Sequence, residues 1–440
     1  MSRHGWWSRA AWFAGALVLG TVATSPAGAA SLTVEEAVTR ALQDSPRLAA
    51  ARRRLDAAGE AETAAGRRML PSVHVSEEFQ HYNEPFAMNF GGNLFTVRDQ
   101  NTNTFSAAAA QPVVGLLRLG SERAALSENR AAGQAQLAAA EAELRERVET
   151  EFLRAFEAQA MRRIAETSAA ELSEQVTVAR ARLASGVITN ADLLRLQVAI
   201  ANARQQALQA EGQSRTARAA LFAAMGVRPA EAVTLTLVEP RTLLAAARAA
   251  APAPTESLLT GAHERRPEVR QQEHLASATA RDARTRAYAL LPDVNLEAAY
   301  IRVDGQQFAP KNSAFVGVKA EWGIWEWGAT EHARRAAVAL AVASRHDAES
   351  VDRQIEAEVA GAVADGDAAR GAVKAAEEAI ASAEEAFRVT EAQAKAGTAT
   401  TTDLLEAQAA LTQSRLNLTR AEYELALSHV RLIHVAGQGR

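Results

Sequence analysis

The sequence predicts a mainly α-helical chain with a transmembrane β-barrel part, built from a helix, strand, strand, long helix, helix unit that occurs twice. Two helical patterns without proline extend over about residues 121–184 and 329–396. Each follows a pair of short segments that break the helical period. Several residues also recur at a constant offset between the two halves of the chain. These three observations indicate a duplicated unit with long helices.

Composition excludes several functional classes. The 440 residues include 48 Lys and Arg, 52 Asp and Glu and no cysteine. Without cysteine, disulfide scaffolds, zinc ribbons and cysteine nucleophiles are excluded. The net charge of −4 is spread along the chain, which argues against a nucleic acid partner because phosphate binding needs clustered Lys and Arg. Abundant alanine favours closely packed helices over an enzyme core with deep pockets.

Residues 1–30 are expected to be a cleavable secretory signal peptide. Arg3 and Arg9 flank the start of an apolar run at 10–23, and the small residues at 27–29 suit a signal peptidase. The run is shorter than the roughly 18 to 20 residues that a membrane-spanning helix needs, so a retained anchor is the weaker alternative. No later apolar run reaches that length, so entry into a membrane would require β-strands in a closed barrel.

The duplication divides the mature chain. The turn sequence at Gly186 recurs at Gly397, and Leu70-Pro71 recurs as Leu291-Pro292. The expected organisation is a first structural repeat at 31–239, a proline-punctuated linker at 240–254 and a second structural repeat at 255–440.

The helices of each repeat are expected to pack side by side. Thr33 and Glu36 form a capping-box pattern that opens a helix at about 34–70, and another helix is expected at about 190–226. At 1.5 Å per residue, each long helix would be a rod of roughly 100 Å. The two shorter helices together approach that length, so they could run end to end alongside it.

Four strands are expected at about residues 72–83, 102–113, 293–303 and 313–323, from loosely alternating apolar residues. The connection 83–101 is expected to be a long exposed loop, and 304–313 a shorter one. Strands of this length can span a bilayer when tilted, and two soluble hairpins packed on helices are the alternative. Four strands are too few to close a barrel, so other copies must complete it. Three copies in a cyclic ring would supply twelve strands and form a tube.

The chain resembles the outer membrane efflux, or TolC, family over roughly residues 31–437. The resemblance rests on the opening Leu32-Thr33-Val34-Glu35-Glu36-Ala37, on Leu70-Pro71, on Gln111-Pro112 and on the twin Gly-x5-Asp-Leu-Leu turns at Gly186 and Gly397. It implies a homotrimer with a 12-stranded β-barrel in the outer membrane lipid, joined to a periplasmic α-helical barrel.

The resemblance also implies a function: the outer-membrane exit duct of a tripartite efflux pump. A periplasmic adaptor (membrane fusion) protein and an inner-membrane transporter would be its partners, and the transporter would choose the cargo. A channel for type I protein secretion or for metal-cation efflux is an alternative within the family. The alternative outside it is a periplasmic coiled-coil adaptor or spacer without a pore.

Two sets of residues at the ends of the long helices are the expected functional sites, a pore constriction and a docking surface. By resemblance, Asp403 and Glu406 match the paired acids that ring the closed periplasmic tip. The family has a basic latch residue in the second turn, and Ala399 occupies that place here, so the sequence does not indicate what keeps the tip closed. The two turns are the expected adaptor-docking surface, although simple helix reversals with glycine C-caps and aspartate capping boxes would have the same pattern. The residues concerned are Gly186, Val187, Thr189, Asp192, Leu193, Gly397, Thr400 and Leu404.

The remaining candidates are aromatic and histidine residues. Trp322, Trp325 and Trp327 close the fourth expected strand and are expected to form an interfacial belt, a ligand-stacking site being the alternative. The nine histidines form no recognisable ligand set, so no metal site is assigned. No phosphate loop or catalytic motif is present in the sequence, so neither a cofactor nor an enzymatic activity is expected.

Overall fold

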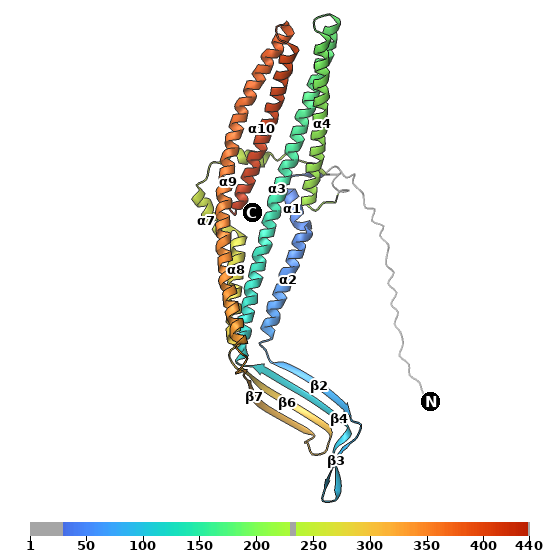
Figure 1. The fold of residues 1–440 in the computed structure, drawn as a ribbon, viewed down its shortest axis with the longest axis vertical. Helices are drawn as coiled ribbons and strands as arrows, with labels where there is room; N and C mark the ends of the chain where they lie inside the picture. The colour runs from blue at the N-terminus through green and yellow to red at the C-terminus, as the bar shows by residue number, and fades with distance from the viewer. Residues whose placement is uncertain (1–29, 229–234, 439–440) are drawn as a thin grey trace, which may run out of the picture.

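The protein is described by a computed structural model over residues 30–228 and 235–438. Helices form a long curved layer with a β-sheet at one end, and we call the opposite end the tip (Figure 1). The prediction of a mainly helical chain with strands is confirmed. The expected signal peptide lies outside the described residues, apart from Ala30.

The same succession of elements occurs twice. The first repeat contains β1 (Ala30–Leu32), α1 (Val34–Asp44), α2 (Pro46–Arg67), β2 (Ser72–His81), β3 (Phe86–Phe90), β4 (Asn93–Pro112), α3 (Gly115–Ala184) and α4 (Asn190–Ala224). The second contains β5 (Leu235–Leu237), α6 (Arg241–Ala249), α7 (Thr255–Arg265), α8 (Pro267–Tyr288), β6 (Asp293–Gln306), β7 (Asn312–Glu321), α9 (Ala329–Ala396) and α10 (Thr401–Val435).

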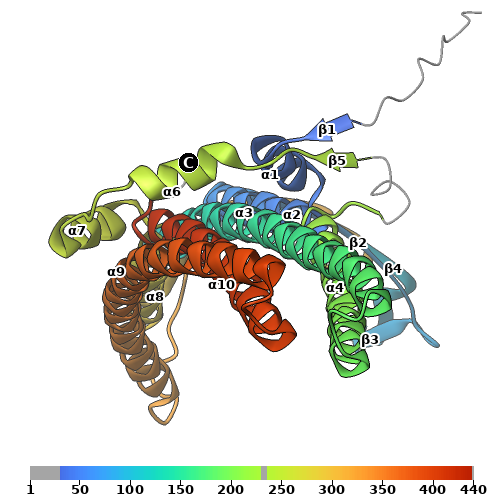
Figure 2. The same cartoon turned by 90° about the horizontal axis from the view of Figure 1, so that it is seen from above.

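The two long helices set the length of the molecule. α3 has 70 residues and α9 has 68, which corresponds to roughly 100 Å each. Near the sheet, α8 packs between α3 and α9, with α2 on the other side of α3; toward the tip, α10 contacts both α9 and α3, with α4 beside α3. The layer is therefore one helix thick and curved, with α1 and α6 on its convex side (Figure 2).

No helix within residues 30–228 and 235–438 combines the length and apolarity required to cross a membrane.

The expectation of one continuous helix at 34–70 is wrong. α1 ends at Asp44, and α2 begins at Pro46 with Ser45 as its N-cap, whose hydroxyl accepts a hydrogen bond from the Leu48 amide. Proline lacks the amide hydrogen that helix continuation needs but suits the first helical position. The same break recurs in the second repeat, where Pro267 opens α8 directly after α7.

The sheet has one apolar face. Its main strands are antiparallel in the order β2-β4-β6-β7, and the register places Val73 opposite Ala109, Ala109 opposite Ala298, and Ala298 opposite Val316. Residues directly opposite one another share a face. That face carries Val73, Val75, Phe79, Phe105, Ala107, Ala109, Leu296, Ala298, Tyr300, Ala314, Val316 and Val318. Polar residues also lie on it, at Glu77, Asn103, Gln111, Arg302, Asp304 and Asn312. The other face is mixed, and polar side chains from every strand lie on it: Ser76, Glu78, Ser106, Glu297 and Lys319.

The expectation of a loop at 83–101 is also wrong. β4 begins at Asn93 and pairs with β3 in a second hairpin that projects beyond the sheet (Figure 1). Gly91 and Gly92 have φ angles of +61° and +90°, which glycine adopts without a steric cost. These two residues make a hairpin turn between the paired Phe90 and Asn93.

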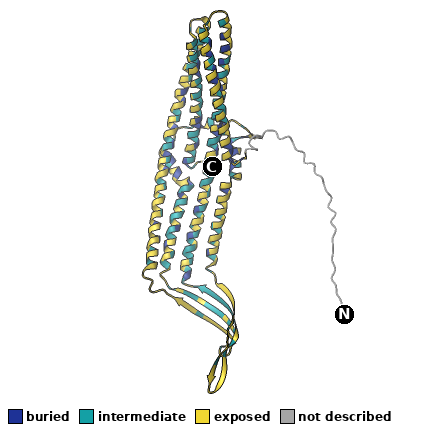
Figure 3. Ribbon diagram, turned by 45° about the vertical axis from the view of Figure 1, so that its right-hand side comes forward, coloured by how far each residue is buried: buried dark blue, intermediate teal, exposed yellow. Residues whose placement is uncertain are grey.

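A compact region lies about halfway along the layer. β1 pairs with β5 in parallel, and a hydrophobic core gathers around Val148, Phe152 and Leu153 of α3, which are fully buried. The expected linker 240–254 contains the helix α6, which packs on α10, so it is not simply an extended connection. Elsewhere the helices have mostly exposed and half-buried residues (Figure 3), as expected of a thin layer.

Candidate functional site

The tip consists of two helix reversals at the end farthest from the sheet (Figure 1). Gly186 and Gly397 have φ angles of +74° and +80°, and no neighbouring atom lies within 4 Å of the place a Cβ would take. The glycines are therefore required by the backbone conformation and not by close packing. Beyond each turn, Thr189 and Thr400 are the N-caps of α4 and α10.

Both aspartates of the turns are helix caps. The Thr189 amide donates to Asp192 Oδ2 at 3.1 Å, and the Asp192 amide donates to Thr189 Oγ1 at 3.2 Å. The corresponding distances for Thr400 and Asp403 are 2.8 and 3.2 Å. These are complete capping boxes, so the structural role considered for the aspartates is present in both turns.

The hydrogen bonds of the capping boxes keep the aspartates ionised. The pKa of Asp192 lies below the usual 3.8, chiefly because the Thr189 hydroxyl donates to its carboxylate. The pKa of Asp403 is lowered chiefly by the Thr400 amide. Both carboxylates therefore carry a full negative charge at neutral pH.

Acidification is expected to loosen both helix starts only at low pH. A depressed pKa means that the cap stabilises the fold above the ordinary aspartate pKa, and that this contribution is lost as the pH falls through the lowered value. Amide exchange at residues 190–193 and 401–404, corrected for the intrinsic pH dependence of exchange, should therefore stay constant from pH 7 to 5 and accelerate below about 3.8. Loss of protection already between pH 7 and 5 would contradict this assignment.

The predicted tip residues separate into different environments. A groove of about 650 Å³ between the two hairpins, which we call the tip groove, is lined by Val187, Thr189, Asp192, Gly397, Ala399, Thr400 and Leu404 among other residues. Leu193 lies instead in a buried cluster with Leu172 and Leu196. Asp403 and Glu406, on the first turns of α10, are exposed to solvent.

Polar contacts between the repeats connect α3 and α4 with α9 and α10 behind the turns. Arg182 donates to the Ala394 carbonyl at 3.2 Å, and Arg195 donates to the Thr402 hydroxyl at 3.4 Å. Glu171 accepts from Gln408 Nε2 at 2.6 Å and from Arg415 at 3.3 Å. We call these contacts the inter-repeat clasp.

Sequence reasoning did not identify the inter-repeat clasp. Gln408 and Arg415 were visible only as residues shared with Gln197 and Arg204 of the first repeat. Their spacing of two helical turns places them on one face of α10, which is a signal for a common partner. Nothing in the sequence pairs them with Glu171, because that contact joins helices from different repeats.

The tryptophans lie where the sheet meets the helices. Trp322, Trp325 and Trp327 follow β7 and are all largely exposed, and the rings of Trp325 and Trp327 meet edge to face with centroids 5.5 Å apart. Trp322 Nε1 donates to the Leu290 carbonyl at 3.3 Å. Indole rings combine an apolar body with a polar N–H, so they suit a boundary between apolar and aqueous surroundings.

Two histidines contact acidic side chains of α3. His274 lies 2.8 Å from Glu128, and His434 lies 3.3 Å from Glu146. Across the described ranges, no group of three or more His, Asp or Glu side chains is arranged to hold a metal ion.

Comparison with known proteins connects this architecture to a family. The chain matches the model of the family described as "Outer membrane efflux protein" over residues 37–227 and 258–438. It is 28% identical over 281 residues to the outer membrane efflux protein BepC of Brucella suis, an alignment that covers 62% of this chain and only 58% of that relative.

Solved structures have the same fold. The outer membrane protein VceC of Vibrio cholerae superposes with a TM-score of 0.79 at 18% identity, covering 92% of this chain and 96% of that one. The CmeC outer membrane channel of Campylobacter jejuni superposes with a TM-score of 0.78 at 14% identity, covering 92% of this chain and 86% of that one. With the family match extending over both repeats, the chain belongs to the outer membrane efflux protein family.

Proposed function

We propose that this protein is the outer-membrane channel of a tripartite efflux pump. Members of its family are transport ducts, and membership places the sheet in the outer membrane and the helical layer in the periplasm. In this role a homotrimer takes substrates from a periplasmic adaptor and an inner-membrane transporter and passes them outside, without catalysis. The observation that carries the proposal is an open, one-sided apolar sheet at the end of a helical layer about 100 Å long.

The edges of the molecule support assembly with further copies. Among the described strands, β2 and β7 each pair with one neighbour only, so both edges of the sheet are open. An open edge in lipid leaves backbone groups unsatisfied, and single-chain barrels need at least about eight strands. Joining β7 of one copy to β2 of the next removes every edge when the ring closes, and three copies supply twelve strands.

The two sides of the helical layer expose apolar side chains, on α4 in the tip half and on α9 near the sheet. α4 and α9 lie at opposite sides of the layer (Figure 2), and both expose large apolar side chains. These are Leu194, Val198 and Leu208 on α4, and Val338, Leu340 and Val342 on α9. Burial of such residues against a sister copy is favourable at roughly 25 cal/mol per Å² of apolar surface. The same ring that closes the sheet therefore also covers these edges.

The two ends of the duct have different tasks in this proposal. The tryptophans form a belt at the periplasmic boundary of the lipid, and the tip turns dock the hairpins of the adaptor. Asp403 and Glu406, three copies each, surround a constriction whose negative field favours cations. The inter-repeat clasp takes the place of the basic residue missing at Ala399 and holds the hairpins in the narrow arrangement.

Purification and conductance measurements test the proposal. The protein is expected to require detergent, to run as a trimer by light scattering in detergent, and to produce stepwise ion conductance in planar bilayers. A periplasmic spacer would instead be extracted in aqueous buffer and produce no ion current across the bilayer. A detergent-independent monomer without conductance would reject the channel.

The assignment of the sheet faces can be tested with adjacent residues of β6. Ala298 lies on the apolar face and Ala299 on the other. Ala298→Arg is expected to reduce trimer in isolated outer membranes strongly, since an arginine facing lipid near the midplane costs about 2–4 kcal/mol. Ala299→Arg, facing the water-filled interior, is the matched control and should assemble. Equal loss in both variants, or loss only for Ala299→Arg, would contradict the assignment.

A further inference from the structure

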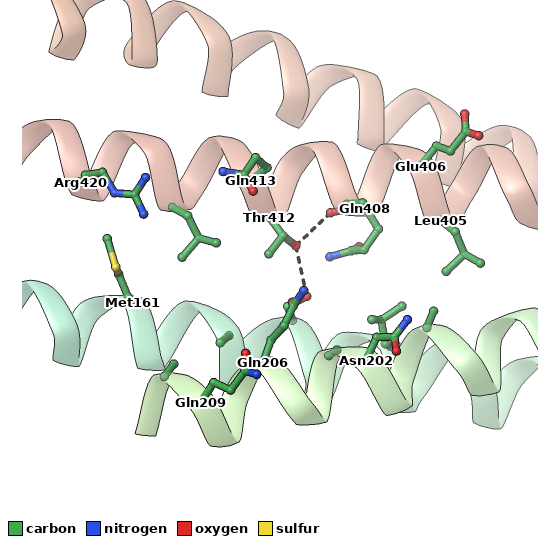
Figure 4. Close-up of a pocket in the computed structure, with 18 of the residues that line it drawn as sticks. Met161, Asn202, Gln206, Gln209, Leu405, Glu406, Gln408, Thr412, Gln413 and Arg420 are labelled. Atoms are coloured by element: carbon green, nitrogen blue, oxygen red, sulfur yellow. Dashed lines mark hydrogen bonds between the residues drawn. The ribbon is translucent and has the colours of Figure 1, made fainter. Parts of the chain in front are cut away.

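A second groove, which we call the amide groove, runs along the tip half of the layer. Its volume is about 600 Å³, its floor is α3, and its walls are α4 and α10 (Figure 4). The tip ends of α4 and α10 both lie toward the concave side of the layer (Figure 2). In the trimer of the proposed function, on which this inference depends, the concave side faces the pore.

The walls of the groove are rich in side-chain amides. The amide residues that line it are Asn202, Gln206, Gln209, Gln213, Gln408 and Gln413. The four on α4 are spaced by three or four residues, so they form one stripe along the helix. Their side chains make no hydrogen bond to another described residue, whereas Glu211 and Arg215 on the same helix pair with each other. The stripe therefore presents free donors and acceptors without net charge.

Gln408 adds a buried, incompletely satisfied amide to the wall. It is 2% exposed, and its Nε2 donates to Glu171 at 2.6 Å, while its Oε1 has no partner among the described residues. Figure 4 shows Gln408 and Thr412 pointing from α10 toward α3, with Gln206 pointing up from α4. The hydroxyls of Thr412 and Ser168 share a hydrogen bond of 3.2 Å, which joins α10 to the floor of the groove. A ligand N–H in the groove could satisfy Oε1 after a small shift of the side chain.

One end of the groove has a positive charge. Arg420 points into the groove beside Met161 (Figure 4), and its guanidinium makes no ion pair with a described residue. Glu157 of α3 interacts electrostatically with Arg420, but the two side chains form no ion pair. A solute that combines hydrogen-bonding groups along its length with an anionic end complements this arrangement.

We propose that the amide groove is a transit subsite for an extended, peptide-like solute that ends in a carboxylate. From Leu405 to Arg420 the wall of α10 measures roughly 22 Å at 1.5 Å per residue. At about 3.3–3.6 Å per residue, an extended peptide of about six residues matches that length. Its amide groups would pair with the glutamines and its terminal carboxylate with Arg420, a charge-assisted contact. The site is solvent-exposed, which suits a duct, because cargo must also leave.

Current blockade in planar bilayers tests this subsite with hexa-alanine as the probe. The trimer is inserted, and the peptide is added to the side that faces the sheet, either with a free carboxylate or with an amidated C-terminus. The free peptide is expected to produce resolved blockades, and the amidated peptide should produce blockades roughly tenfold shorter through loss of the charge-assisted contact. Arg420→Gln should shorten the blockades of the free peptide to the same extent and leave those of the amidated peptide unchanged.

Variants of the stripe provide the control for position. The double variant Gln206→Leu with Gln209→Leu is expected to shorten the blockades roughly tenfold, because two hydrogen bonds are lost. Gln205→Leu, the neighbouring amide on α4 outside the groove lining, should keep the wild-type dwell time. A channel that conducts but shows no blockades, or blockades insensitive to the double variant, would reject the subsite while the proposed function stands. An absence of conductance before peptide is added would reject the proposed function itself.

Discussion

Neutralising the acids at the start of α10 is expected to remove most of the cation preference of the channel. Asp403→Asn with Glu406→Gln keeps the size of both side chains and one acceptor oxygen for the helix cap, and it removes six charges from a trimer. Charges a few ångströms from a permeating ion in water interact by about 1 kcal/mol each. The ratio of cation to anion permeability should therefore fall by at least roughly fivefold, the equivalent of about 1 kcal/mol.

The first repeat supplies the matched control for this experiment. Asp192 occupies the same capping position in α4 as Asp403 in α10, but Arg195 stands where the second repeat has Glu406. Asp192→Asn therefore alters an equivalent cap without altering the proposed ring. Reversal potentials under a salt gradient would measure both variants. Unchanged selectivity in the double variant, or an equal change in Asp192→Asn, would remove Asp403 and Glu406 from the constriction.

Breaking the inter-repeat clasp is expected to open the tip. Glu171 accepts hydrogen bonds from Gln408 and Arg415, and Glu171→Ala removes both at once. Each bond contributes about 1 kcal/mol, and the buried Gln408 and the half-buried Arg415 are left without this acceptor. Three copies lose these contacts together, so the wide arrangement of the hairpins should become more populated. Single-channel conductance is expected to rise several-fold, with more frequent excursions to large openings.

Glu174 is the control for the clasp because it is an exposed acid one turn further along α3 with no ion pair to a described residue. Glu174→Ala removes a similar charge and should leave the conductance close to that of the unmodified protein. Thermal unfolding of both variants would separate local loosening from loss of the fold. Conductance that stays low in Glu171→Ala with an intact trimer would show that the clasp does not hold the tip closed.

Long elements were predictable because their signals are local. Uninterrupted helical periodicity without proline indicated 329–396, which is where α9 lies, and 121–184, which α3 extends back to Gly115. The sequence does signal the breaks at Pro46 and Pro267, because proline favours the first position of a helix. Helical periodicity alone does not detect such a break. The sequence predicts a loop where the hairpin at 86–98 lies, because Gly91 and Gly92 mark a loop and a hairpin turn equally well.

The residues of the site also divide into those that the sequence indicates and those that only the tertiary structure brings together. The capping boxes at Thr189 and Thr400 follow from four consecutive residues each, so the sequence was sufficient to indicate them. Leu193 was expected on a docking surface, and it packs in the buried cluster between α3 and α4. Burial of that residue depends on how α4 is rotated against α3, which no single helix specifies. Glu171, Gln408 and Arg415 likewise meet only through the packing of two repeats.

Sequence by itself determined the duplicated helix and strand pattern and the two glycine turns, since periodicity and backbone conformation are properties of short segments. The strand number in the sequence also predicts that sister copies are needed to close a barrel. Tertiary structure decided which sheet face is apolar, which helices form the edges of the layer and which side chains join the repeats. These features depend on strand register and on helix rotation, where a shift of one residue turns a side chain to another face. The amide groove arises only from the approach of α4 and α10 over α3, helices that belong to different repeats.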